Sequence, residues 1–357
     1  MLLERLQIES FRAITTPVVL DGLAPVNLIF GENNSGKTSA LEAAALLLRP
    51  NDPPQWVQLA RNRDLDMILQ DGLWSFFPSA VSLYVDDGPK TTGEISILGL
   101  LGAETRRLTA QASTSISFET TEAEKSPVAL DPRPSGISAR LTLSVKTRIN
   151  LGAEHEMIFG HGLLAERGSA GEPLRCFTVA PMTHRSTRAM VKLISNAVDE
   201  GRKRFAVELL QLFAPQVLDL DNSLTRGREG IRVSHAQRGV VDLASFGDGM
   251  RRAAALALAL SSAQSGVLLI DELEAGIHPS ILPTVVASLV RAAKETGVQI
   301  LATSHSLEAF DALLEACKNT ATDLKLFHLQ REGSAHVVRS YDKAKLIEFR
   351  ELGLDLR

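Results

Sequence analysis

The residues best suited to chemistry lie near the N-terminus, in the stretch from Gly31 to Thr38. This stretch follows the pattern G-x-x-x-x-G-K-[ST], whose glycines let the backbone turn tightly and surround a phosphate with N–H groups. Lys37 would reach the β- and γ-phosphates of a nucleotide, and the hydroxyl of Thr38 could ligate Mg²⁺. The predicted phosphate-binding residues are Gly31, Asn33, Asn34, Ser35, Gly36, Lys37 and Thr38.

Two elements must position this loop. The apolar run Val26–Phe30 before it reads as a buried strand, and an alanine- and leucine-rich segment after it reads as a helix that ends near Arg49 and Pro50. A helix that begins at the loop points the positive end of its dipole at the phosphate. The pattern alone also occurs in loops that bind nothing, but the strand before it and the helix after it favour nucleotide binding.

A second set of candidates follows the apolar run Val267–Ile270. Asp271 at the end of this predicted strand would hold Mg²⁺ opposite Thr38, and Glu272 would orient or deprotonate an attacking water. An acid pair could instead only cap the next helix, an alternative that the loop at Lys37 disfavours. Most of the chain separates the two motifs, so a large segment must be inserted between them.

Two further stretches could contact an anion. Ser245, Gly247 and Gly249 precede an alanine- and leucine-rich segment, so they would form the N-terminus of another helix. His305 follows the apolar run from Ile300 and would lie at the tip of a buried strand.

In this order, the motifs resemble those of ABC-type ATPase heads. They are most similar to the OLD-like branch of the AAA family ATPases, relatives of the RecF and SMC heads. The resemblance covers roughly residues 1–48 and 175–340. The segments that carry it are the loop Gly31–Thr38, the Ser-x-Gly-Asp-Gly stretch from Ser245, Leu268–Pro279 and Ala302–His305.

The resemblance implies ATP and Mg²⁺ as ligands and assigns further roles. Ser245, Gly247 and Gly249 would be a signature motif that binds the γ-phosphate held by the opposite subunit of a homodimer. His305 would be the switch histidine, and Arg12 would match the family's N-terminal Phe-Arg. The implied catalytic residues are Glu272, Lys37 and His305, and the implied magnesium ligands are Thr38 and Asp271.

The chain also departs from the family pattern in two places. No glutamine stands near Met182–Arg185, where the family's Q-loop is expected, and no room remains for the Toprim nuclease domain that many OLD-like proteins carry.

We therefore expect an α/β fold, a P-loop NTPase of the ABC-ATPase-head type with a mixed or parallel sheet. The head would comprise residues 1–48 and 175–357, with a helical lobe at about 186–262. Residues 49–174 would be an inserted, mainly antiparallel β region. The runs that read as strands there are Ala80–Val85, Glu94–Leu98, Arg107–Ser113, Ser115–Glu119 and Ser138–Arg148, and Gly162–Pro173 reads as a loop.

Composition excludes several classes of protein. Of the 357 residues, 45% are hydrophobic and 22% are charged, as in soluble globular proteins. The net charge of −4 gives no overall basic bias, and two cysteines are too few for a disulfide framework. We find no signal peptide, no apolar run long enough for a membrane span and no sustained heptad pattern. We expect a cytoplasmic protein without a long coiled coil.

Three tempting features have plainer alternatives. Asp219 and Asp221 could be a nuclease-like acid pair, but we favour turn capping. Glu154, His155, Glu156 and His161 could bind a metal, but a solvated charge cluster on an exposed loop is favoured. The basic residues between Arg185 and Arg204 could contact a phosphate backbone or simply form a solvated helical face, and both interpretations stay open.

The resemblance implies an ATPase that works as an ATP-gated homodimer on DNA. It would act in antiphage defence or repair, beside a separate effector or nuclease. The alternative is an ATP-gated scaffold or clamp with little turnover. Glu272 favours the enzyme, since a pure scaffold would not need a water-activating acid. A nucleotide-binding subunit of a membrane transporter is disfavoured by the β region and the missing glutamine.

Overall fold

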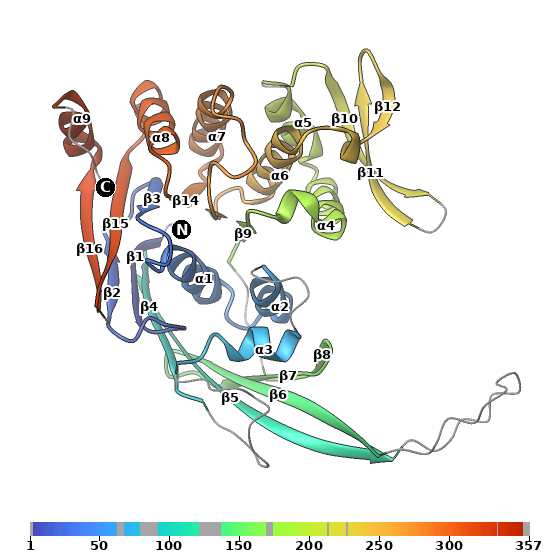
Figure 1. Cartoon of the computed structure of the whole chain (residues 1–357), viewed down its shortest axis with the longest axis vertical. Coiled ribbons are helices and arrows are strands. Elements are labelled where there is room, and N and C mark those ends of the chain that lie inside the picture. The colour runs from blue at the N-terminus through green and yellow to red at the C-terminus, as the bar shows by residue number, and fades with distance from the viewer. Residues whose placement is uncertain are drawn as a thin grey trace, which may run out of the picture.

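The computed structural model describes residues 3–62, 68–78, 92–120, 137–168, 174–212, 214–225, 228–333 and 335–352. Two large sheets face each other with the first helix between them, and a row of helices covers the other side of one sheet (Figure 1). The α/β architecture agrees with the sequence-based prediction.

The predicted motifs lie on a six-stranded sheet with the order β16-β15-β3-β14-β13-β9. All its strands run parallel except the edge strand β16. The central strands are buried along their whole length, as their continuous apolar runs require. The strands are β3 (Val26–Phe30), β9 (Cys176–Val179), β13 (Val267–Ile270), β14 (Gln299–Ser304), β15 (Leu324–Glu332) and β16 (Ala335–Asp342).

The second sheet is antiparallel and has the order β2-β1-β4-β5-β6-β7-β8. Its strands are β1 (Leu3–Ser10), β2 (Val18–Asp21), β4 (Ile95–Leu101), β5 (Glu104–Thr120), β6 (Ile137–Ile149), β7 (Glu154–Phe159) and β8 (Leu163–Arg167). Strands β5 and β6 extend away from the rest of the molecule as a long arm (Figure 1). Because β1 pairs with β4, this sheet crosses the predicted boundary between residues 48 and 49. The antiparallel strands are therefore not a separate inserted unit.

Some strand boundaries also differ from the prediction. The two runs Arg107–Ser113 and Ser115–Glu119 form the single strand β5, because β6 pairs with it without interruption. The expected loop from Gly162 contains β8, which pairs with β7. The expected strand Ala80–Val85 lies outside the described residues.

Helix α1 (Lys37–Leu48) fills the space between the two sheets. It is buried on nearly every side, so alanine recurs along it and both sheets approach closely. Its neighbours in this core come from β1, β4 and β5 on one side and from Ile29, Leu269 and Leu301 on the other. Two short helices, α2 (Pro53–Arg61) and α3 (Leu69–Trp74), cover one end of α1 (Figure 1).

Helices pack on the opposite face of the six-stranded sheet and form a second core. They are α4 (Thr187–Asp199), α5 (Lys203–Gln211), α6 (Asp248–Ser262), α7 (Leu282–Thr296), α8 (Leu307–Asn319) and α9 (Lys343–Glu351). A small sheet packs against α4 and α5; its strands are β10 (Val217–Thr225), β11 (Arg228–His235) and β12 (Gly239–Asp242). Among the described residues, none of the helices has the length and apolar character needed to cross a lipid bilayer.

Two of these helices follow directly on turns. Helix α6 starts at Asp248, after residues Leu243–Ser245 have formed a separate 3₁₀ turn. Helix α7 starts at Leu282, after a turn in which the N–H of Ile281 donates to the carbonyl of His278 at 3.0 Å.

Candidate functional site

The loop between β3 and α1 has the shape that its glycines predict. Gly31 has a φ of 154°, and a Cβ there would collide with the carbonyl oxygen of Leu329 on β15. Gly36, at φ 98°, precedes the first turn of α1, which no side chain in the described part of the chain caps. The first N–H groups of α1 are therefore available to a phosphate.

Lys37 lies inside this loop. Its ammonium donates to the carbonyls of Gly31 at 2.8 Å and Glu32 at 2.6 Å, and the residue is 8% exposed. Burial lowers the pKa of Lys37, and the negative charges of Asp271 and Glu272 partly oppose this effect. The side chain is thus preorganised over the loop, with two uncharged carbonyl partners that a phosphate could replace.

Asp271 lies directly opposite the loop, at the end of β13. One of its carboxylate oxygens is 3.1 Å from the hydroxyl of Thr38 and the other is 3.3 Å from it. Two adjacent oxygen ligands of an octahedral Mg²⁺ lie about 3.0 Å apart when each metal–oxygen bond is about 2.1 Å. The pair therefore fits the hard-oxygen ligand set predicted for Mg²⁺, with phosphate and water left to complete it.

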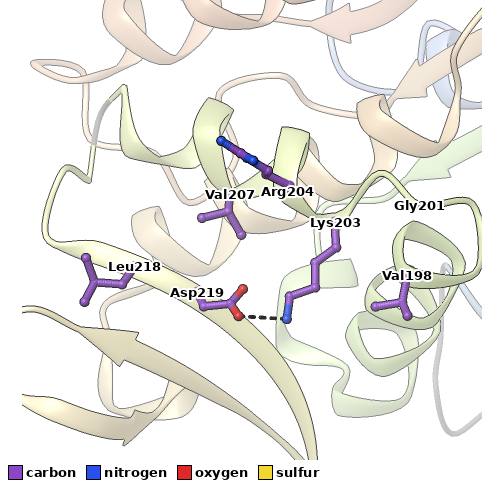
Figure 2. A pocket seen from close by; sticks show the side chains of 7 residues that line it. All are labelled: Val198, Gly201, Lys203, Arg204, Val207, Leu218 and Asp219. Carbon is purple, nitrogen blue, oxygen red and sulfur yellow. Dashed lines mark hydrogen bonds and ion pairs between the residues drawn. The ribbon is translucent and has the colours of Figure 1, made fainter.

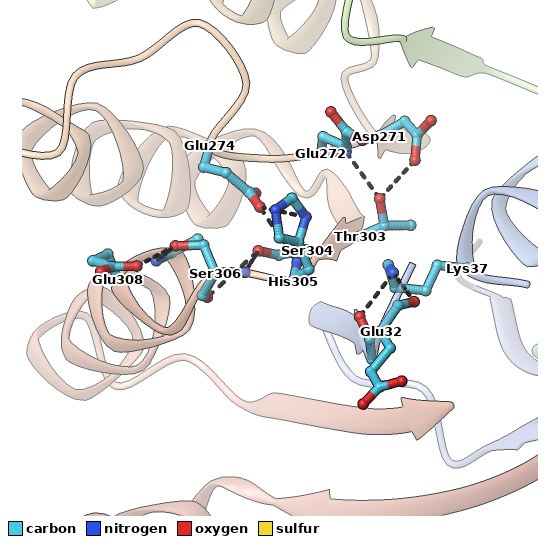
Figure 3. Close-up of polar contacts among 12 residues, drawn as sticks. Glu32, Lys37, Asp271, Glu272, Glu274, Thr303, Ser304, His305, Ser306 and Glu308 are labelled. Atoms are coloured by element: carbon cyan, nitrogen blue, oxygen red, sulfur yellow. Dashed lines mark hydrogen bonds and ion pairs between the residues drawn. The ribbon is translucent and has the colours of Figure 1, made fainter. Parts of the chain in front are cut away.

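Thr303 on β14 is a residue of this site that sequence analysis missed. Its hydroxyl donates to Asp271 at 2.7 Å and accepts the N–H of Glu272 at 2.9 Å (Figure 3). Glu272 has a φ of 49°, an uncommon conformation for a residue with a side chain, and the bond to Thr303 helps to hold it. One buried hydroxyl thus fixes both acids.

The other predicted anion-binding residues lie at the N-terminus of α6. Ser245 is on the preceding 3₁₀ turn, where its hydroxyl donates to the carbonyl of Asp242 at 2.7 Å. Gly247 precedes the first turn of α6, and a Cβ at Gly249 would lie 3.4 Å from the carbonyl of Gly276. None of their contacts with described residues reaches the loop of Lys37.

Arg252, one turn into α6, joins this helix to Asp271 and Glu272. Its side chain is fully buried and donates to the carbonyls of Ala180, of Asp271 at 2.8 Å and of Glu272 at 3.1 Å. Burial lowers the pKa of Arg252 to about 10, against the nearby charge of Asp271. Sequence analysis missed this residue, although an arginine within an alanine-rich helix was a usable signal.

A known protein family matches most of the chain. Residues 26–311 match the family described as "AAA domain, putative AbiEii toxin, Type IV TA system". The chain belongs to this family.

The chain is also similar to individual proteins and solved structures. The uncharacterized protein MJECL11 of Methanocaldococcus jannaschii is 37% identical over 113 residues, which are 31% of this chain and 99% of that protein. Among solved structures, an SmcHead bound to the C-winged helix domain of ScpA has a TM-score of 0.51 and 13% identity, over 98% of this chain and all of that chain. An SMC head domain from Thermotoga maritima has a TM-score of 0.45 and 12% identity, over 96% and 99%. The first structure supports the predicted ABC-type ATPase-head fold.

Arg12 of this AAA-domain protein has several partners within the chain. Its guanidinium makes two bonds to the carboxylate of Glu42 on α1, at 2.7 and 3.1 Å, and one to Ser75 at 2.7 Å. It also lies over the ring of Phe76, 4.4 Å from the ring centre. These contacts hold Arg12 between the antiparallel sheet and α1, and its contact with nucleotide stays a prediction.

The metal and nuclease alternatives also have structural explanations. Glu154, His155 and Glu156 lie on β7 and not on a loop, so alternation buries His155 and turns the two glutamates outward. Asp219 and Asp221 both accept from Lys203. Within the described residues, no group of three acidic, histidine or cysteine side chains could hold a metal.

Most of the predicted basic segment is neutralised within the chain. Arg185 pairs with Asp248, Arg202 with Glu200, and Arg204 with Glu208. Lys203 borders a hollow of about 440 Å³ between α4, α5 and β10 (Figure 2). These pairs favour the solvated-face interpretation.

Proposed function

We propose that the chain binds ATP with Mg²⁺ and hydrolyses it. The arrangement of Thr38, Asp271 and Thr303 carries the proposal, because it brings the two motifs together and leaves Glu272 beside them. Thr38 and Asp271 would hold the metal, which supplies positive charge to the phosphates. Lys37 would exchange its two carbonyl partners for phosphate oxygens, and the first N–H groups of α1 would bind the β-phosphate.

Glu272 would accept a proton from the attacking water, and His305 would contact the γ-phosphate.

Two variants, Lys37→Ala and Glu272→Gln, separate the binding of ATP from its hydrolysis. The first variant should lose ATP affinity, whereas the second should bind ATP and hydrolyse it about 10²–10⁴-fold more slowly. Binding can be measured by calorimetry and turnover by phosphate release. Unchanged turnover in Glu272→Gln would remove this residue from the mechanism.

We infer further that two copies share each nucleotide. In the described part of the chain, Ser245, Gly247 and Gly249 make no hydrogen bond to the loop of Lys37, so their donors suit a nucleotide on another subunit. Two copies related by a two-fold axis would each supply this motif to the other. The exposed apolar side chain of Ile281 lies 3.6 Å from where a Cβ at Gly249 would be, and such a dimer would cover it.

Mixing two inactive variants tests the shared site. Lys37→Ala and Ser245→Arg chains should each be inactive alone. Their heterodimer should regain part of the activity, since one of its two sites has both motifs intact. Activity of the wild type as a strict monomer, or an inactive mixture in which heterodimers are shown to form, would refute sharing.

A DNA-related role in defence or repair, beside a separate effector or nuclease, rests on the family resemblance. Purification from native cells, followed by identification of bound protein and nucleic acid, tests it.

Arg188 and Lys192 on α4 carry no ion pair with the described residues, so their reversal to glutamate should flatten any salt dependence of DNA binding. An unchanged salt slope would remove α4 from DNA contact.

A further inference from the structure

Three acids, Asp271, Glu272 and Glu274, follow β13, and among the described residues only Glu274 contacts the predicted switch histidine. Glu274 lies in the turn after β13, and His305 directly follows β14. Because β13 and β14 are adjacent parallel strands with Ile270 opposite Ala302, both residues emerge at the same edge of the sheet. Figure 3 shows the carboxylate of Glu274 pointing at the imidazole of His305.

Two contacts converge on one oxygen of this carboxylate. The backbone N–H of His305 donates to Oε1 of Glu274 at 3.3 Å, and Nδ1 of the same residue also lies 3.3 Å from Oε1. Glu272, two residues earlier, has its N–H bound to Thr303 and makes no contact with His305 among the described residues. The histidine is therefore held by the acid that the ATPase proposal leaves without a role.

This geometry defines how the ring is presented. A carboxylate oxygen beside Nδ1 favours the form of imidazole that carries a proton on Nδ1. The backbone N–H of His305 donates to the same oxygen of Glu274, so both the backbone and the ring of His305 are held by one carboxylate. The side chain of His305 is 49% exposed and that of Glu274 is 17% exposed, so the ring lies outward and its support lies inward.

The buried position of the Glu274 carboxylate is energetically unfavourable. Its second oxygen, Oε2, is buried and has no hydrogen-bond partner among the described residues. Burying an acceptor without a donor destabilises the fold, and more so when the acceptor is charged. The turn does not need this side chain, because it is the backbone carbonyl of Glu274 that accepts the N–H of Ile277, at 3.0 Å.

We propose that Glu274 is a positioning residue for ATP hydrolysis, which holds His305 through Nδ1 and so presents Nε2 to the γ-phosphate. The inference rests on the proposed ATPase function. Glu274 acts through His305 and does not touch the nucleotide or the attacking water. Removing Glu274 should therefore harm turnover only while His305 is present.

A double-mutant cycle tests this dependence. Glu274→Ala and His305→Ala should each lower kcat by about 10–100-fold with little change in the KM for ATP. The double variant should be no slower than His305→Ala alone. Losses that multiply in the double variant, or a Glu274→Ala enzyme with wild-type kcat, would overturn the proposal.

Two conservative changes sharpen the cycle. Glu274→Gln keeps an amide oxygen that can accept both bonds from His305, so it should recover most of the activity lost in Glu274→Ala. Glu308→Gln is the matched control. Glu308 is also an acid near His305 in the chain, but it accepts from the hydroxyl of Ser306. This control should stay within about twofold of wild type. No recovery in Glu274→Gln would refute the hydrogen-bond role, and a large loss in Glu308→Gln would show that any nearby charge change suffices.

The tautomer of His305 can be measured without any turnover. Side-chain ¹⁵N spectra at pH 8, where a free imidazole is neutral, should show His305 protonated on Nδ1. The signal can be assigned by its absence in His305→Ala. Glu274→Ala should lose this preference, and an unchanged tautomer would refute the contact. If the wild type hydrolyses no ATP, the proposed function fails while this measurement still decides whether Glu274 orients His305.

Discussion

Arg252 offers a test of how the helices are joined to the nucleotide site. Replacing it with methionine keeps much of the side chain's length and apolar stem but removes the donors to Ala180, Asp271 and Glu272. The carbonyl of Ala180 keeps a second donor, the N–H of Thr183, and that of Glu272 keeps the N–H of Ala275. Within the described residues, the carbonyl of Asp271 keeps none.

The expected loss follows from these three acceptors. The buried carbonyl of Asp271 would be left without a donor, which costs about 1–3 kcal/mol. The hydrogen bonds to the other two carbonyls would also be lost, but this loss is partly offset because no guanidinium has to be buried. We expect Arg252→Met to lower the free energy of unfolding by about 2–4 kcal/mol. Arg252→Lys, which keeps a charge but cannot reach all three carbonyls, should lose about half as much.

Urea unfolding of the two variants and the wild type measures this loss, provided that the slope of the transition is unchanged. ATP turnover of folded Arg252→Met should also fall, because its carbonyl partners belong to Asp271 and Glu272. A variant within about 1 kcal/mol of the wild type, with normal turnover, would show that Arg252 does not join α6 to these residues.

Three further predictions concern the loop, the acids and the sheets. Thr303→Val should lower kcat by about 10–100-fold through loss of a hydrogen bond to a charged group, whereas Thr303→Ser should stay near wild type; equal activity in the two would refute the role of the hydroxyl. Because burial lowers the pKa of Lys37 below 10.5, its charge is lost at a lower pH in the folded protein, and calorimetric ATP affinity should fall as the pH rises toward 10.5. Lys37→Ala, already weak, should show no such fall, and the ligand-free wild type should gain stability over that pH range because the cost of burying the ammonium disappears. Deleting residues 92–168 should prevent folding, because β1 and α1 would lose the apolar side chains of β4 to β7 that pack against them. Circular dichroism would measure this. A folded product that binds ATP would show that the rest of the chain does not need these strands.

The sequence was informative where chemistry and local pattern coincide. The loop at Lys37 and the acids after β13 are contiguous motifs, and β3 and β13 have the predicted bounds because continuous apolar runs mark them. Thr303 and Arg252 escaped notice because their importance comes from partners far away in the chain.

Long-range pairing also explains the corrections. Nothing in residues 95–101 shows that β4 will pair with β1, since either edge of a sheet offers the same backbone groups. The pairing of Arg12 with Glu42 on α1 was not predicted either, because a family motif does not reveal which acid will lie nearest.

Helix α1 has a consequence for the kinetics of ligand binding. A helix enclosed by two sheets cannot tilt or fray without opening both, so its amide hydrogens should be among the slowest in the molecule to exchange with solvent. The loop of Lys37 is therefore attached to a rigid helix. An arriving phosphate would find the N–H groups of the first turn already in place, and little ordering would oppose association. On-rates should then be limited by diffusion and by the release of the Lys37 ammonium from the carbonyls of Gly31 and Glu32, a side-chain motion on the nanosecond scale.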